Sequence, residues 1–188
     1  MNTPTHLLIG LAVCGKAHAP RVNLAAVVGG LMPDLSLYLL SIHAIWWRGI
    51  SPQIVFDEYY FSDAWQAVFQ VDNSFILWGG LLILAFWRGP LWLRAFAGAG
   101  FLHLCFDFPF HNDDARAQFW PLTDWVFHSP LSYWDVDHHG GWVALAELAL
   151  VVVLLGILWR RHHGMLARIG LGLTAASVIL PAVIFSAL

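Results

Sequence analysis

The sequence predicts an all-α fold, a polytopic membrane helix bundle of about six apolar helices with two long outer loops. Composition is the first observation behind this prediction, because 59% of the 188 residues are hydrophobic and only 11% are charged. A soluble domain carries roughly 25% charged residues. The second observation is a mean hydropathy of +0.67, and the third is the grouping of apolar residues into long runs. The length fits a single integral membrane domain, residues 1–188.

Six apolar runs are expected to form helices, at residues 5–18, 22–44, 73–88, 91–108, 141–160 and 166–187. A helix that crosses the bilayer perpendicularly needs about 20 residues. The second, fifth and sixth runs reach that length. The first, third and fourth are shorter, so we expect them to be tilted, packed inside the bundle or incompletely spanning. No cleavable signal peptide is recognised, so the first run is expected to remain in the mature protein.

The basic residues predict the orientation of the bundle. With the link between the first two runs inside, seven of the nine Lys and Arg residues lie inside and two lie outside. By the positive-inside rule, both termini and the loops 45–72 and 109–140 then face outside. We therefore expect an integral protein of a bacterial inner membrane, with these loops on the periplasmic side. The seven inner residues are Lys16, Arg21, Arg88, Arg94, Arg160, Arg161 and Arg168.

Tryptophans gather at both expected membrane boundaries, as is typical of interfacial anchors. Those near the inner boundary are Trp87, Trp92 and Trp159. Those in or beside the outer loops are Trp46, Trp47, Trp65, Trp120, Trp125, Trp134 and Trp142. The larger number of tryptophans at the outer boundary has two interpretations. The loops lie flat on the headgroups, or they line a site for a lipid or another amphiphile.

A polar run begins at the end of the fourth apolar segment. His103, Asp107 and His111 are spaced four residues apart, so in a continuous helix their side chains share one face. Two imidazoles and a carboxylate in this spacing suit a zinc or iron ion. Ionisable groups at bilayer depth are costly and usually functional. The run therefore predicts a membrane-embedded metal site.

Other ligand-type residues are expected at the same outer side. His6 begins the first run, Asp34 lies in the outer half of the second, and His139 precedes the fifth. Glu147 follows His139 by eight residues, two helical turns inward on about the same face. Each also has a plainer interpretation. Asp34 can hydrogen-bond at the Pro33 kink, and Glu147 can pair with a histidine or stay protonated.

Two sets of candidate site residues follow. The metal-binding candidates are His6, Asp34, His103, Asp107, His111 and His139. The catalytic candidates, whose side chains can orient a water or move a proton, are Asp113, Asp114, Glu147 and His138. The two aspartates can alternatively cap a following helix, and the adjacent histidines 138 and 139 can be an interfacial pair.

Three short motifs carry a resemblance to a known family. Thr5-His6-Leu7-Leu8-Ile9-Gly10, Met32-Pro33-Asp34 and His103-x-x-x-Asp107 together resemble the membrane-bound metal-dependent hydrolases of the YdjM type. That family is similar to zinc-dependent phospholipase C and related single-strand nucleases. The resemblance implies an all-helical fold, a di- or trinuclear zinc site and cleavage of a phosphoester. It also implies metal ligation by His6, Asp34, His103 and Asp107.

One motif of that family is missing. Its members usually carry Thr-His-Ser after an Arg-Gly in the loop that follows the second run. Here Arg48-Gly49 is followed by Ile50-Ser51-Pro52. His43, His111 and His138 are the candidate replacements for the missing histidine, and the departure indicates a divergent subgroup.

The sequence thus predicts a metal-dependent hydrolase that acts on a phosphoester or another bond of a lipid or amphiphilic substrate at the outer membrane boundary. Zinc is the expected metal, with iron or manganese as alternatives. Two other functions are alternatives to the hydrolase. A membrane di-iron oxygenase would need more clustered histidines, and a non-catalytic proton or metal transporter would use Asp34 and Glu147 as an intramembrane relay.

Several functional classes are not indicated. A net charge of −3 with neutral histidines leaves no basic patch for nucleic acid. The sequence has no P-loop, no dinucleotide-binding turn and no Gly-x-Ser-x-Gly elbow. Cys14 and Cys105 are too few for a disulfide scaffold, and we expect them at opposite membrane faces. The sequence does not indicate an oligomeric state.

Overall fold

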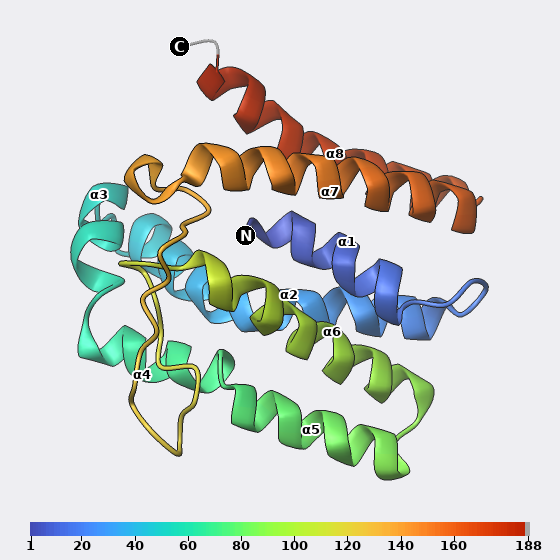
Figure 1. Cartoon of the computed structure of the whole chain (residues 1–188), viewed down its shortest axis with the longest axis horizontal. Coiled ribbons are helices and arrows are strands. Elements are labelled where there is room, and N and C mark those ends of the chain that lie inside the picture. Colours follow the sequence, from blue (N-terminus) through green and yellow to red (C-terminus); the bar gives the residue numbers. More distant parts are fainter. Residues whose placement is uncertain (187–188) are drawn as a thin grey trace.

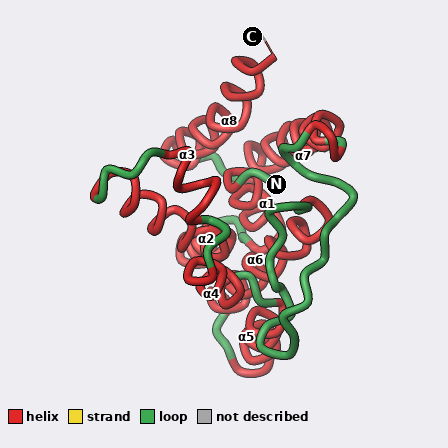
Figure 2. The backbone as a smooth tube through the Cα atoms, turned by 90° about the vertical axis from the view of Figure 1, so that its left-hand side faces the viewer, coloured by secondary structure: helices red, strands yellow, loops and turns green. Residues whose placement is uncertain are grey.

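The computed structural model describes the backbone of residues 1–186 and the side chains of residues 1–179. Within these residues every regular element is helical and there is no strand, as the tube in Figure 2 shows. The predicted all-α class is therefore confirmed. The last residue of the run expected at 166–187 lies outside the described backbone.

The helices begin and end at residues suited to those positions. The α-helices are α1 (Thr3–Cys14), α2 (Pro20–Ile42), α3 (Pro52–Ile54), α4 (Asp63–Asp72), α5 (Phe75–Arg88), α6 (Leu91–Asp107), α7 (Gly140–Arg161) and α8 (Met165–Ser186). Ser62 and Ser74 accept backbone N–H groups at the starts of α4 and α5. A proline lies in the first turn of α1 and of α2, where no N–H donor is needed.

Three helical stretches are long and apolar enough to cross a membrane: Pro20–Trp47, Asp63–Arg88 and Gly140–Arg161. The first continues α2 through a π-helical turn, and the second joins α4 and α5. Thr3–Cys14 and Met165–Ile179 are apolar but shorter. These helices support a membrane protein, while the larger number of six membrane helices stays a prediction.

The links between the helices divide between the two ends of the bundle. The short links 15–19, 89–90 and 162–164 lie at one end, on the right in Figure 1. The long segments 43–62 and 108–139 lie at the other end, on the left. The basic residues expected inside belong to the short links and to the helix ends beside them, so they gather at a single end. Which side of the membrane that end faces stays a prediction.

The first long segment is more ordered than the sequence indicated. The loop expected at 45–72 contains α3, a π-helical turn at Val55–Tyr59, and α4. A serine cap and a mixed polar and apolar sequence explain α4, which buries Phe69 completely. The second long segment is largely irregular between the 3-10 turns Phe108–Phe110 and Val136–His138.

The centre of the bundle is the mutual packing of α1, α2 and α6. Small residues allow this close approach, as is common between membrane helices. A Cβ added at Gly29 of α2 would overlap the carbonyl group of Phe96 on α6. A Cβ at Gly30 would lie 2.9 Å from the carbonyl oxygen of His6 on α1. These two glycines therefore set the distances at which α1 and α6 lie against α2.

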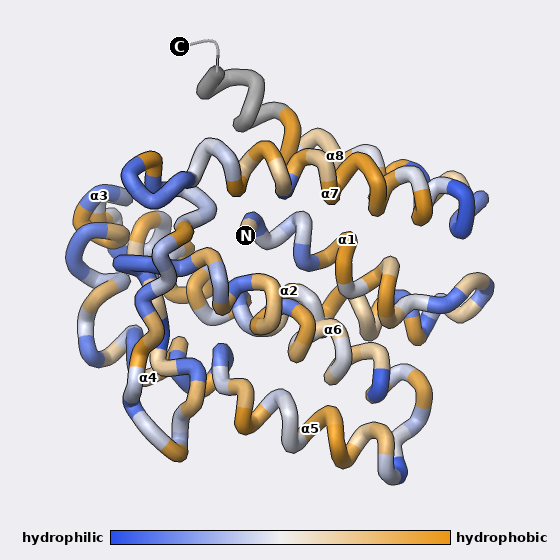
Figure 3. The backbone as a smooth tube through the Cα atoms, viewed as in Figure 1, coloured by the Kyte–Doolittle hydropathy of each residue, from blue (hydrophilic) through white to orange (hydrophobic). Residues whose placement is uncertain are grey.

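The outside of the bundle carries large apolar side chains. Figure 3 shows hydrophobic residues along the helices, and hydrophilic residues concentrated in the segments that link them. Ile83 and Trp87 of α5 are 70% and 71% exposed, and Leu173 of α8 is 68% exposed. Such a surface is costly in water and suits contact with lipid.

Candidate metal centre

Three buried side chains meet between α1 and α6. His6 Nε2 lies 2.8 Å from Asp107 Oδ1, and His103 Nε2 lies 3.1 Å from Asp107 Oδ2. One ligand atom from each residue lies within 4.8 Å of the other two. Two imidazoles and a carboxylate are ordinary ligands of zinc and of iron. The group can therefore bind a metal ion.

Helix geometry explains how these side chains come together. His103 and Asp107 are one turn apart on α6, so their side chains share a face. The helix α1 lies beside α6 and brings His6 against His103. The two imidazole rings stack with their centroids 3.7 Å apart and their planes 15° apart. Stacking directs both Nε2 atoms toward the same carboxylate.

A backbone contact sets the tautomer of His103. Its Nδ1 lies 2.7 Å from the carbonyl oxygen of Gly30, which can only accept a hydrogen bond. The Nδ1 therefore carries a proton, and in a neutral ring Nε2 presents a lone pair to the Asp107 carboxylate. Two lone pairs facing each other in a buried site are unfavourable unless a cation lies between them. A proton or a metal ion can fill that role, and a carbonyl on the far ring nitrogen is typical of metal-binding histidines.

Asp34 of α2 joins this group as a neighbour. Its Oδ1 lies 3.6 Å from His103 Nε2. Thr3 Oγ1 donates a hydrogen bond of 2.5 Å to its other oxygen, and Tyr38 donates to Thr3 in turn. Asp34 is 7% exposed. The structure thus places His6, Asp34, His103 and Asp107 together, although a ligand role for all four stays a prediction.

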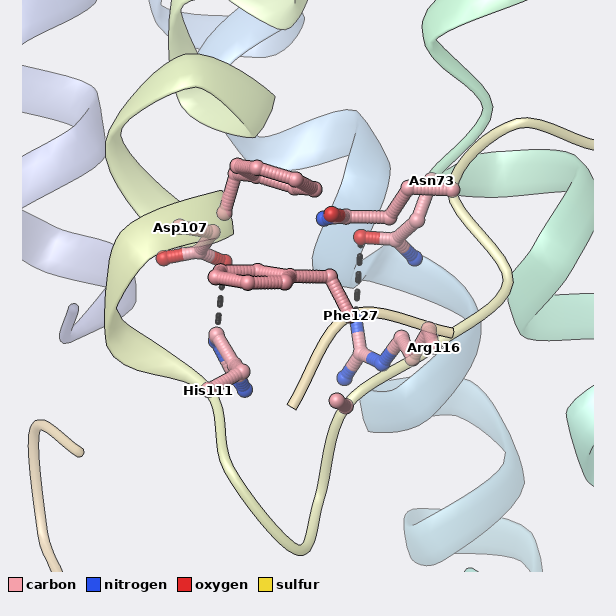
Figure 4. A pocket seen from close by; sticks show the side chains of 8 residues that line it. Asn73, Asp107, His111, Arg116 and Phe127 are labelled. Carbon is pink, nitrogen blue, oxygen red and sulfur yellow. Dashed lines mark hydrogen bonds and ion pairs between the residues drawn. The ribbon is translucent and has the colours of Figure 1, made fainter. Parts of the chain in front are cut away.

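His111 reaches the same carboxylate from beyond the end of α6. Its Nε2 lies 3.3 Å from Asp107 Oδ2, and its Nδ1 lies 2.8 Å from Asp114 Oδ2. Figure 4 shows the His111 side chain directed toward Asp107. Burial opposes a positive charge on this ring, but the Asp107 and Asp114 carboxylates outweigh it and raise the pKa of His111. The helix does not continue to residue 111, so the interaction comes from the turn that follows α6.

Asp107 is the common partner of every basic group in the cluster. Besides the three histidines, the amino group of Met1 lies 2.6 Å from its Oδ1. His6 Nδ1 is buried and has no hydrogen-bond partner among the described residues. One carboxylate therefore faces four nitrogen groups, which makes it the electrostatic centre of the site.

Glu147 is placed differently from the other candidates. It is 3% exposed on α7, and it accepts hydrogen bonds from the backbone N–H of Asn2, the side chain of Asn2 and the hydroxyl of Thr5. These contacts fasten α7 to the beginning of α1. Glu147 thereby supports the helix that carries His6.

We expect Glu147→Ala to lower the free energy of unfolding by about 1–3 kcal/mol, because three donors lose their acceptor. Glu147→Gln should recover much of this loss, since an amide oxygen still accepts from Thr5. Unfolding in detergent followed by circular dichroism measures both values. A Gln variant as unstable as the Ala variant would contradict this account of the Glu147 hydrogen bonds.

The remaining candidates lie apart from the cluster. His138 Nδ1 lies 2.6 Å from Asp135 Oδ2, and this pair is partly exposed. His139 is exposed at the start of α7, and Asp113 is exposed beside an open cavity. No contact joins these three side chains to His6, His103 or Asp107 within the described part of the chain. A role for them stays a prediction.

An open cavity of about 410 Å³ adjoins the cluster. Its wall includes Asp34, Asp107 and His111, together with Arg116 and Tyr133. Burial, followed by the nearby Asp114 and Asp107 carboxylates, raises the pKa of Tyr133, so its hydroxyl stays neutral. A ligand in this cavity can reach the cluster directly.

Arg116 and Tyr133 were not among the residues expected at the site. Arg116 is one of the two basic residues that the positive-inside rule leaves on the outer side. Arg116 follows Asp113 and Asp114 and precedes an aromatic segment, and this position is only a weak sign that it belongs to the site. The signal for Tyr133 was weaker still, because aromatic residues are frequent throughout residues 108–135.

The fold and the centre together define a class of protein. Its apolar helices suit a membrane, and its buried histidine and carboxylate group can hold a metal ion. Comparisons with protein-family models, curated proteins and solved structures found no match to the chain. Membership of the YdjM-type family therefore stays a prediction.

Proposed function

We propose that this protein is a membrane-embedded, metal-dependent hydrolase that cleaves a phosphoester or a related bond of a lipid or another amphiphile. One observation carries the proposal. Two buried imidazoles face the Asp107 carboxylate, with the His103 tautomer set by a carbonyl group, and this carboxylate lies at the wall of an open cavity. The motifs that resemble YdjM-type hydrolases agree with this activity.

His6, His103 and Asp107 would hold the metal, and Asp34 and His111 are the candidates for completing its surroundings or serving a second ion. A divalent ion supplies Lewis-acid polarisation of a phosphoryl oxygen and makes a water more acidic. Zinc fits best, because its catalytic sites combine three such protein ligands with an open position. Iron and manganese are the alternatives.

The pair His111 and Asp114 is our candidate for proton transfer. Asp114 orients the imidazole through Nδ1, and His111 lines the cavity. A histidine oriented by a carboxylate is typical of a general acid or base, and the raised pKa of His111 favours the acid. Asp114 would then act through His111 instead of contacting the substrate.

The position of the cavity supports an amphiphilic substrate. Its wall combines the polar groups of the centre with Leu37 and Phe56, and the outside of the bundle is apolar. A polar head can reach the centre while an apolar tail stays beside the helices. The positive-inside rule assigns this end of the bundle to the outer, periplasmic face.

Metal analysis combined with lipid hydrolysis tests the proposal on detergent-solubilised protein. We expect stoichiometric zinc, together with products released from extracted bacterial phospholipid in mixed micelles. A chelator should stop the release and added zinc should restore it. Protein that purifies metal-free and cannot be loaded would refute the proposal. Bound iron with substrate-dependent oxygen consumption would favour the oxygenase.

The proposed orientation of the protein in the membrane is tested at two exposed positions on opposite ends of the bundle. In a chain with Cys14 and Cys105 replaced by alanine, Asp137→Cys should react with an impermeant maleimide in intact cells. His163→Cys should react only after lysis, because it lies in the link 162–164 among the basic residues. Both native cysteines are free and Cys105 is exposed, so they must be removed first. The reverse labelling pattern would overturn the orientation.

A further inference from the structure

Arg116 is a buried cation with an unusual set of partners. It is 7% exposed and belongs to the irregular segment between α6 and α7. Its Nε donates to the Tyr60 hydroxyl at 3.3 Å, and its Nη1 donates to Asn73 Oδ1 at 2.9 Å. Its guanidinium carbon lies 5.0 Å from the centre of the Phe69 ring. Figure 4 shows the Arg116 side chain directed toward Asn73.

These partners leave the charge of Arg116 incompletely balanced. Within the described residues the only carboxylate within 4.0 Å is that of Asp34, which lies at that limit and makes no hydrogen bond with it. A guanidinium has five N–H donors, and a buried one is normally matched by a carboxylate or another anion in direct contact. Two neutral acceptors and an aromatic ring compensate in part. The remaining N–H donors and the unbalanced charge of Arg116 are therefore available to bind an anion.

Arg116 also lies where two open cavities meet. The first is the cavity of about 410 Å³ beside Asp34, Asp107 and His111. The second has a volume of about 440 Å³ and includes the aromatic side chains of Tyr60, Phe61 and Trp134. Arg116 and Tyr133 are the polar residues that line both.

We propose that Arg116 binds the anionic group of the substrate and turns it toward the His6, His103 and Asp107 group. A flat apolar part of the same molecule then lies against the aromatic side chains of the second cavity. The proposal rests on the proposed function for the identity of that anion as a phosphoryl group. The other charged groups of the second cavity, Asp57, Asp113 and Asp114, disfavour a further anion there. The favoured ligand thus carries a single anionic group.

Phenylphosphonate is a suitable probe, because its carbon–phosphorus bond resists hydrolysis and binding is read without turnover. Its Kd is measured by calorimetry on the full-length, zinc-loaded protein in detergent. Arg116→Met should weaken binding about ten- to hundredfold, the range expected for lost hydrogen bonds to a charged group. Zinc content should be unchanged. Arg116→Lys should recover part of the affinity, since it restores the charge without the fork of donors.

Arg48→Met is the matched control, because Arg48 is an exposed arginine in the other long segment and lines neither cavity. Its Kd should stay within about twofold of the wild-type value, as is usual for a distant surface charge. An unchanged Kd in Arg116→Met with zinc retained would overturn the proposal. Equal weakening in Arg48→Met would do the same.

The second cavity is tested without disturbing Arg116. Phe61 is 49% exposed, so Phe61→Ala should fold even if an Arg116 variant does not. It should weaken phenylphosphonate about five- to tenfold, as expected for a lost aromatic contact, and leave methylphosphonate unchanged. Equal affinity of the wild type for the two probes would contradict the aromatic subsite. Protein that binds phenylphosphonate through Arg116 but hydrolyses no ester keeps this inference and loses the proposed function.

Discussion

Replacing His103 by alanine is expected to remove the proposed metal ion and to reduce the proposed hydrolysis by at least about 100-fold, beyond the tenfold to hundredfold effect typical of an outer-shell partner. The His103 imidazole is held in place from both of its nitrogen atoms. It faces Asp107 and Asp34 through Nε2, and Gly30 fixes its other nitrogen. Metal content by mass spectrometry and product release from micellar phospholipid measure the two effects.

The matched control for this variant is His163→Ala. His163 is exposed at the opposite end of the bundle, so its loss should change neither metal content nor activity. Helicity and detergent-resistant folding should survive in both variants, because α6 keeps its remaining packing against α2. Full metal occupancy in His103→Ala would contradict the metal centre itself, whatever the substrate.

Asp107→Asn is expected to cause the largest loss of stability among single changes in the cluster. The carboxylate is 3% exposed and contacts His6, His103, His111 and the Met1 amino group. Removing one partner of a buried ionic group costs about 3–5 kcal/mol, because the charges left behind have no compensation. The expected result is a lower free energy of unfolding in metal-free protein, with metal binding lost as well.

Chemical unfolding in mixed detergent micelles measures this effect, with Asp137→Asn as the control on an exposed carboxylate. The control should change stability by less than about 0.5 kcal/mol, as is usual for surface positions. Stability unchanged in metal-free Asp107→Asn would mean that the histidines around it are neutral and need no counter-charge. The electrostatic account of the cluster would then be wrong.

Local patterns in the sequence predict much of the fold and part of the site. Long apolar runs predict helices because each run is a local pattern within one segment. The spacing of His103 and Asp107 predicts a shared face because the geometry of an α-helix places residues four positions apart on the same side. The prediction of a single outer loop at 45–72 is wrong for α4, although Ser62 is a residue type that begins helices.

The contacts that escaped prediction join residues far apart in the chain. Arg116 meets Asn73 and Tyr60 across 43 and 56 positions, and Glu147 meets Asn2 across 145. No periodicity encodes such pairs. The sequence offers a histidine as the partner of Glu147, whereas the structure gives it hydrogen bonds from Asn2 and Thr5, which lie far away in the chain. The sequence shows that a partner is needed and does not show which residue provides it.

The hydrogen bonds between Glu147 and the start of α1 have a consequence for the order of biosynthesis. A ribosome delivers α1 before α6 and α7, so Thr5 and His6 at first lack the partners that bury them. Asp107 follows about a hundred residues later at 5–20 residues per second, and Glu147 follows Asp107 by a further 40 residues. The centre therefore closes only after α7 has left the ribosome. Truncation before α7 should leave a nascent protein that inserts its first helices yet cannot retain metal.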